Sequence, residues 1–195
     1  GGFVSGLLYF RNFTQVGPTA QTLVTTGTTH FENFNSNWGG DVIFTGARMY
    51  TRGTTYNGTS YLEKYGANDD ASVGGNNFIG NCELRNTGSR YFLMGNGVAD
   101  TWGGDLVMNN MGTFRMYLAH NSAGNSIAGN LTLNNTGTGT DNDNYFMASA
   151  SSSLAIGGNL TINNTSSATT NANIYFSDGN LSSATVGGDV VINNN

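Results

Sequence analysis

Residues 156–164 read Ile-Gly-Gly-Asn-Leu-Thr-Ile-Asn-Asn, and this stretch decides the fold. The repeated pattern has, in order, an apolar residue, a small residue, a glycine, and a position that is Asp or Asn. A run in which every second residue is apolar follows, and an Asn pair ends it. The pattern recurs along the chain, and such internal repetition is typical of solenoids and other repeat architectures. Clear copies occupy 38–44, 102–110, 127–135 and 186–194, and weaker copies fit the same frame at 5–12, 57–64 and 79–88.

The repeat unit is short and variable in length. The distance between equivalent glycines rises from 22 residues (Gly58 to Gly80) to 30 residues (Gly158 to Gly188). A second apolar cluster lies within most units, so each unit is expected to hold two or three short strands separated by polar turns. The residues predicted to stack as ladders at the turns are Gly40, Gly80, Gly104, Gly129, Gly158, Gly188, Asn110, Asn135, Asn164 and Asn194.

A unit of this size cannot bury a hydrophobic core alone, whereas stacked units cover one another. We therefore predict an all-β fold, a parallel β-solenoid or β-helix of roughly seven or eight stacked units with strands about 4.8 Å apart. The glycine at each corner is expected to supply backbone angles that a Cβ would forbid. The alternative is an antiparallel β-sandwich of hairpin repeats, but tight two-residue Asn-Gly hairpin loops are scarce here.

The chain reads as one repetitive segment, 1–195, of a longer protein. Residues 1–118 form aromatic-rich, irregular units, and residues 119–195 form regular Gly-Gly-Asn/Asp units. Trp38 and Trp102 share a repeat position with Val73, Ile127, Ile156 and Val186, so both are expected in the core.

The composition excludes several classes of protein. Only 10% of the residues are charged, the net charge is −5, and Lys and Arg together number seven, so nucleic acid is not an expected partner. The single cysteine cannot form a disulfide within the chain. No apolar run is long enough to span a membrane as a helix.

Four segments resemble repeats of a known family: NFTQVGPTAQ (12–21), TTYNGTSYLEK (54–64), ELRNTGSRYFLMGNG (83–97) and AGNLTLNNTG (128–137). Similar segments occur in the very large, SprB-like surface proteins of gliding Bacteroidota, which the type IX secretion system exports. The resemblance implies a structural segment of an extracellular, cell-surface adhesin or filament with a role in adhesion or gliding. Its implied partners are flanking repeats, secretion machinery, other surface proteins and surface glycans.

The repeat itself argues against catalysis. Asp41, Asp105 and Asp189 occupy a position that is Asn in other units, and an amide cannot replace a carboxylate that transfers protons. Such exchange is typical of a turn or capping residue that accepts hydrogen bonds. Cys82 aligns with apolar positions and is expected to be buried. We therefore predict no enzyme activity and no cofactor.

Two weaker possibilities stay open. A polysaccharide-binding or polysaccharide-processing β-helix would have its site near residues 50–75, which include the only adjacent acidic pair, Asp69-Asp70. Asp141 and Asp143 alternate with Asn and could ligate Ca²⁺, although the run lacks the Gly and Glu of an EF-hand loop. Neither His30 nor His120 has the spacing of a metal-ligand pair.

Overall fold

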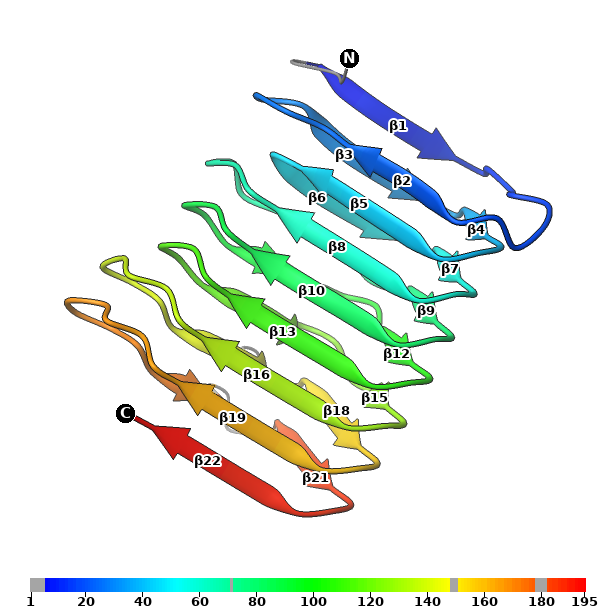
Figure 1. Ribbon diagram of the computed structural model, residues 1–195. Coiled ribbons are helices and arrows are strands. Elements are labelled where there is room, and N and C mark those ends of the chain that lie inside the picture. Colours follow the sequence, from blue (N-terminus) through cyan, green and yellow to red (C-terminus); the bar gives the residue numbers. More distant parts are fainter. Residues whose placement is uncertain (1–5, 71, 148–150, 178–181) are drawn as a thin grey trace.

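A computed structural model describes residues 6–70, 72–147, 151–177 and 182–195. Within these ranges every secondary-structure element is a strand, and every strand pairing is parallel. The chain winds as a stack of coils from one end of the molecule to the other (Figure 1). The predicted parallel β-solenoid is thus confirmed. The described residues include no helix of the length and apolarity needed to cross a membrane.

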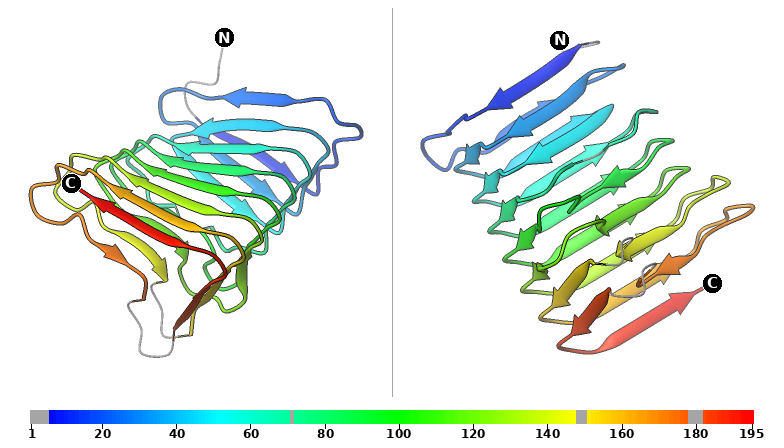
Figure 2. Two further views of the ribbon diagram at one scale, coloured as in Figure 1. Left: turned by 60° about the horizontal axis from the view of Figure 1, so that its bottom comes forward. Right: turned by 180° about the vertical axis from the view of Figure 1, so that it is seen from behind.

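Each coil passes through three faces, and the strands of each face line up into sheets (Figure 2). Sheet I is the long face: β2 (Gln21–Val24), β5 (Val42–Gly46), β8 (Ser60–Lys64), β10 (Cys82–Asn86), β13 (Leu106–Asn110), β16 (Leu131–Asn135), β19 (Leu160–Asn164) and β22 (Val190–Asn194). Sheet II holds β4 (Asn37–Trp38), β7 (Thr55–Tyr56), β9 (Asn77–Phe78), β12 (Thr101–Trp102), β15 (Asn125–Ile127), β18 (Ser153–Ile156) and β21 (Ser183–Val186).

The third face is divided into two sheets. Sheet III contains β1 (Leu7–Arg11), β3 (His30–Phe34) and β6 (Arg48–Arg52). Sheet IV contains β11 (Phe92–Leu93), β14 (Met116–Ala119), β17 (Asn144–Met147) and β20 (Ile174–Tyr175). Between the two sheets, Gly74 makes isolated bridges to Arg52 and Val98.

The register of sheet I follows the repeat. Leu131 pairs with Leu106 on one side and Leu160 on the other, and Val42 pairs with Ser60, so the short unit between Gly40 and Gly58 keeps the same frame. One alignment was wrong. The segment Leu7–Arg11 pairs with β3 in sheet III, not with sheet I.

Alternation along each strand builds the core. The strands of sheet I send every second side chain inward, as in β16, where Leu131, Leu133 and Asn135 are buried and the residues between them are half-buried. Complete burial of a Leu side chain stabilises the folded state by about 1.5–3 kcal/mol. Each strand of sheet I from β5 to β19 adds one or two buried apolar side chains, so the core is continuous along the stack.

Sheet II contributes a column of large side chains. Trp38, Tyr56, Phe78 and Trp102 are buried in register on successive coils, and Ile127 continues the column. The rings of Tyr56 and Phe78 stack at 4.7 Å with an interplanar angle of 3°. Trp38 and Trp102 are therefore core residues, as expected. Val73 was assigned to this column, and that assignment is wrong because Phe78 fills the position.

Candidate functional site

The repeated glycines lie where one coil approaches the next. A Cβ on Gly104 would lie 2.5 Å from Asn81 Oδ1, and one on Gly158 would lie 2.6 Å from Asn130 Oδ1 and 2.9 Å from the Gly129 carbonyl oxygen. Neither glycine has a positive φ, so the expectation of special backbone angles at this corner was wrong. Close contact between coils is the reason for glycine here. Gly40, Gly80, Gly129 and Gly188 are similarly crowded by the preceding coil.

Left-handed backbone occurs instead at the corner that follows the third face. Asn12 (φ 52°), Asn35 (φ 48°) and Gly53 (φ 57°) occupy this corner on three successive coils, directly after β1, β3 and β6. Asn and Gly are the residues that adopt this conformation most readily.

The Asp or Asn of the repeat accepts a hydrogen bond from the next coil. The backbone N–H of Asn130 donates to Asp105 Oδ1 at 2.7 Å, and the backbone N–H of Asn159 donates to Asn130 Oδ1 at 2.9 Å. Asp105 itself donates its N–H to Asn81 Oδ1, and Asp189 donates its N–H to Asn159 Oδ1. A carboxylate and an amide each supply the single oxygen that this contact needs.

The Asn pairs form two further ladders. On the outer side, Asn134 Nδ2 donates to Asn109 Oδ1 and Asn163 Nδ2 donates to Asn134 Oδ1, both at 2.8 Å. On the inner side the donation runs the opposite way: Asn135 Nδ2 donates to Asn164 Oδ1 at 2.9 Å. Asn164 Nδ2 then donates to Asn194 Oδ1 at 2.7 Å, while Asn110 Nδ2 donates to Asn144 Oδ1 at 3.1 Å.

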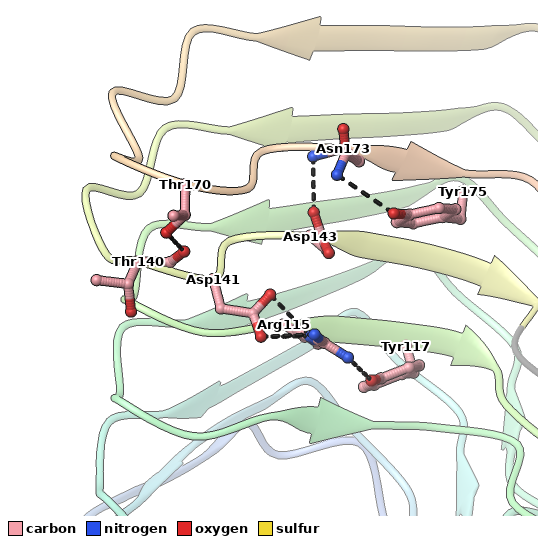
Figure 3. Close-up of polar contacts among 8 residues, drawn as sticks. All are labelled: Arg115, Tyr117, Thr140, Asp141, Asp143, Thr170, Asn173 and Tyr175. Atoms are coloured by element: carbon pink, nitrogen blue, oxygen red, sulfur yellow. Dashed lines mark hydrogen bonds and ion pairs between the residues drawn. The ribbon is translucent and has the colours of Figure 1, made fainter.

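The two carboxylates proposed for Ca²⁺ have separate protein partners (Figure 3). Asp141 pairs with Arg115, whose Nε donates to both carboxylate oxygens at 2.9 Å and whose Nη2 lies 2.6 Å from Oδ2. Asp143 Oδ1 accepts the backbone N–H of Asn173 at 2.8 Å. The guanidinium already neutralises Asp141, so this carboxylate is engaged in linking two coils. Among the described residues, no group of three or more His, Cys, Asp and Glu side chains is arranged to hold a metal.

The other reactive side chains lie apart from one another. Cys82 is buried in sheet I, and burial raises the pKa of its thiol. His30 Nε2 contacts Asn68 Nδ2 at 3.1 Å, and His120 Nδ1 contacts Asn96 Oδ1 at 3.2 Å. Burial lowers the pKa of His120.

Two titratable side chains, Lys64 and Asp70, are buried where the third face is interrupted, and the repeat pattern does not predict their burial. Lys64 takes the place of the inner Asn of β8, and its Nζ donates to the carbonyl oxygens of Gly66 at 3.0 Å and Arg90 at 3.1 Å. Asp70 is wholly buried, and its Oδ1 accepts from the backbone N–H (3.1 Å) and the hydroxyl (3.0 Å) of Ser72. Burial raises the pKa of Asp70 to about 8 and lowers the pKa of Lys64 to about 8.

A shallow groove on the outer surface of sheet I includes Tyr61 and Glu83 in its lining. The polar groups there bind one another. Tyr61 donates its hydroxyl hydrogen to Glu63 Oε2 at 2.6 Å and accepts from Arg85 Nη1 at 3.1 Å, while Asn109 Nδ2 donates to Glu83 Oε1 at 2.7 Å. The Arg85–Tyr61 and Asn109–Glu83 contacts link successive coils as the ladders do.

Comparison with protein-family models, with curated proteins and with solved structures finds no match to this chain.

Proposed function

We propose that this chain is a structural repeat segment of an extracellular cell-surface adhesin or filament, with no catalytic role. One observation supports this most: the polar residue that recurs in every regular unit, whether Asp or Asn, accepts the same backbone hydrogen bond from the next coil. Asp105 and Asn130 make equivalent contacts at 2.7 and 2.9 Å. A site that performed chemistry would need a particular residue at a particular coil.

The architecture suits a mechanical role. Neighbouring coils are joined by the backbone ladders of three faces, by three side-chain ladders and by a shared apolar core. Hydrogen bonds between parallel strands run along the axis of the stack. A force along that axis is shared at each interface by many bonds at once, so a rod or stalk is the natural use of such a structure.

The resemblance to SprB-like surface proteins supports the particular setting. We propose export by the type IX secretion system and a role in adhesion or gliding. The proposed partners are further copies of the repeat, the secretion machinery or other surface proteins, and surface glycans. A further repeat is a suitable neighbour because each described coil covers the core of the next.

Polysaccharide processing near residues 50–75 is the less favoured function. Asp70, one of the two carboxylates on which that hypothesis depends, is wholly buried, and Lys64 beside it is also buried. A polysaccharide could not reach either group without an opening of the coil.

Labelling of intact cells tests the proposal. Antibodies raised against residues 1–195 should label unpermeabilised cells of the source organism, and deletion of the gene should reduce attachment or spreading on a surface. Labelling that requires permeabilised cells would contradict the proposal.

A further inference from the structure

The outer surface of sheet III carries aromatic and basic side chains. β1, β3 and β6 pair in register, so their outward residues form a grid of three rows. The rows contain Leu7, His30 and Arg48; Tyr9, Glu32 and Tyr50; and Arg11, Phe34 and Arg52. No polar ladder of the Asp/Asn type joins these strands.

Two aromatic rings of the grid, Tyr9 and Tyr50, pack against a third, Phe34. The Phe34 ring lies edge to face with Tyr9 (centroids 5.3 Å apart, 76°) and with Tyr50 (5.0 Å, 86°). The Arg48 guanidinium lies 5.0 Å from the centre of the Tyr50 ring and 3.9 Å from Glu32. These contacts hold the three rings in a fixed arrangement, with Tyr9 still 42% exposed.

Two arginines flank Phe34 without an acidic partner. Arg11 and Arg52 belong to the same row, one on each side of Phe34, and both are exposed. Within the described part of the chain, neither guanidinium lies within ion-pair distance of a carboxylate. Strand β3 lies between β1, which carries Arg11, and β6, which carries Arg52. Because neighbouring strands are about 4.8 Å apart, the two strands that carry the arginines are roughly 9.6 Å apart. A cavity of about 250 Å³ opens between them and is lined by Tyr9, Arg11, Phe34, Asn35 and Arg52.

The charge of this face is opposite to that of the chain. The grid carries three of the seven Lys and Arg residues, and its one carboxylate, Glu32, is already paired with Arg48. A chain with a net charge of −5 therefore presents a small positive surface at this cavity. The unpaired guanidinium groups of Arg11 and Arg52 repel each other, and this repulsion weakens the folded state slightly. An anion bound in the cavity would remove the repulsion.

We propose that this cavity binds an acidic sugar unit of a glycan. A sugar ring has an apolar face that packs on an aromatic side chain, and Phe34 and Tyr9 provide that surface. A guanidinium binds a carboxylate or sulfate through two parallel N–H donors, and Arg11 and Arg52 provide these on either side of the ring. Asn35, held in left-handed backbone at the edge of the cavity, offers an amide to the hydroxyl groups. This inference rests on the proposed extracellular role and names the ligand class for it.

Titration of the purified 195-residue chain with a galacturonate hexamer, followed by calorimetry, tests the site. A sulfated oligosaccharide of the same length and a neutral glucose hexamer are run beside it. We expect the acidic probes to bind and the neutral probe not to bind. Arg52→Gln should weaken binding about tenfold because one charged hydrogen-bonding partner is lost. Arg90→Gln is the matched control: Arg90 is also exposed and the change in net charge is the same, but it lies near Phe114 and away from sheet III. It should leave the affinity unchanged.

Several results would overturn the site. These are failure of both acidic probes to bind, equal weakening by Arg52→Gln and Arg90→Gln, and equal binding of the neutral hexamer. Binding of the carboxylated or the sulfated probe alone would support the site and identify the acidic group. Phe34→Leu, which keeps both charges, should also weaken binding while the circular dichroism stays that of the parent; unchanged affinity would contradict the aromatic contact. Because these measurements use purified protein, their failure leaves the cell-surface labelling experiment unaffected, and the two proposals fail separately.

Discussion

Truncation of Leu133 to alanine should expose the dependence of each coil on its neighbours. Leu133 is wholly buried in β16 and pairs in register with Met108 and Ile162, which are also buried. Leu→Ala changes at fully buried positions cost about 2–5 kcal/mol, because transfer free energy is lost and a cavity is left. Ile192 occupies the same column in β22 but is 58% exposed, so Ile192→Ala should cost about 1 kcal/mol or less.

Urea unfolding followed by circular dichroism measures the two losses, and hydrogen exchange with mass spectrometry locates them. In a stack where each unit contacts only its neighbours, the Leu133→Ala defect should speed exchange in β13, β16 and β19 and leave β5 and β8 protected. Equal losses of stability for the two variants, or uniform loss of protection along the chain, would refute a core built coil by coil.

Three further changes test other parts of the structure. Asp105→Ala should lower the free energy of unfolding in urea by about 1 kcal/mol, because the acceptor for the Asn130 backbone N–H is lost. The control Asp69→Ala, at an exposed position, should change stability by less than about 0.5 kcal/mol. Equal effects of the two changes would contradict the ladder. Gly158→Ala should destabilise by about 2 kcal/mol, because its Cβ would lie 2.9 Å from the Gly129 carbonyl oxygen, and a wild-type unfolding midpoint would show that the coils are not in close contact there. Burial raises the folded-state pKa of Asp70 from 3.8 to about 8. The stability that this group contributes is therefore complete below about pH 4 and is lost as the pH rises through 8. Asp70→Asn should reduce the fall in stability between pH 4 and pH 8, and an identical pH profile for the variant would show that Asp70 is not buried.

Sheet I could be predicted from the sequence because its pattern carries its own register. The glycine before the strand and the alternation within it recur in every unit from Gly40 onward, and an Asn pair closes the strand in the regular units. Ser60 and Cys82 were placed correctly in this way, although neither is a large apolar residue.

The third face could not be predicted so well. The run Leu7–Arg11 alternates like a strand of any sheet, and alternation alone does not tell one face from another. The distinguishing signal is the residue that follows the strand. Asn12, Asn35 and Gly53 mark the left-handed corner after sheet III, whereas an Asn pair marks the end of many strands in sheet I.

The charged features depend on turn geometry that residue types do not reveal. Lys64 lies in a position where the regular units have Asn, and its long side chain reaches the carbonyl oxygens of Gly66 and Arg90 at the interrupted third face. Arg11 and Arg52 are far apart in the sequence and share a cavity only because β1, β3 and β6 pair in one register. No pattern in the sequence joins the two residues.

The structural role of the repeated Asp or Asn is the central claim, and replacing every Asp at that position by Asn tests it most directly. Asp41 Oδ1 and Asp105 Oδ1 each accept a backbone N–H from the next coil, as Asn does on other coils. Asp189 occupies the same position in the repeat and donates its own N–H to Asn159 Oδ1. Cells producing the triple variant Asp41→Asn, Asp105→Asn, Asp189→Asn should attach to surfaces as the parent cells do, and the purified variant should unfold at the parent's urea midpoint. A variant that keeps the parent's unfolding midpoint but loses attachment would contradict the claim, because the carboxylates would then have a function that an amide cannot perform.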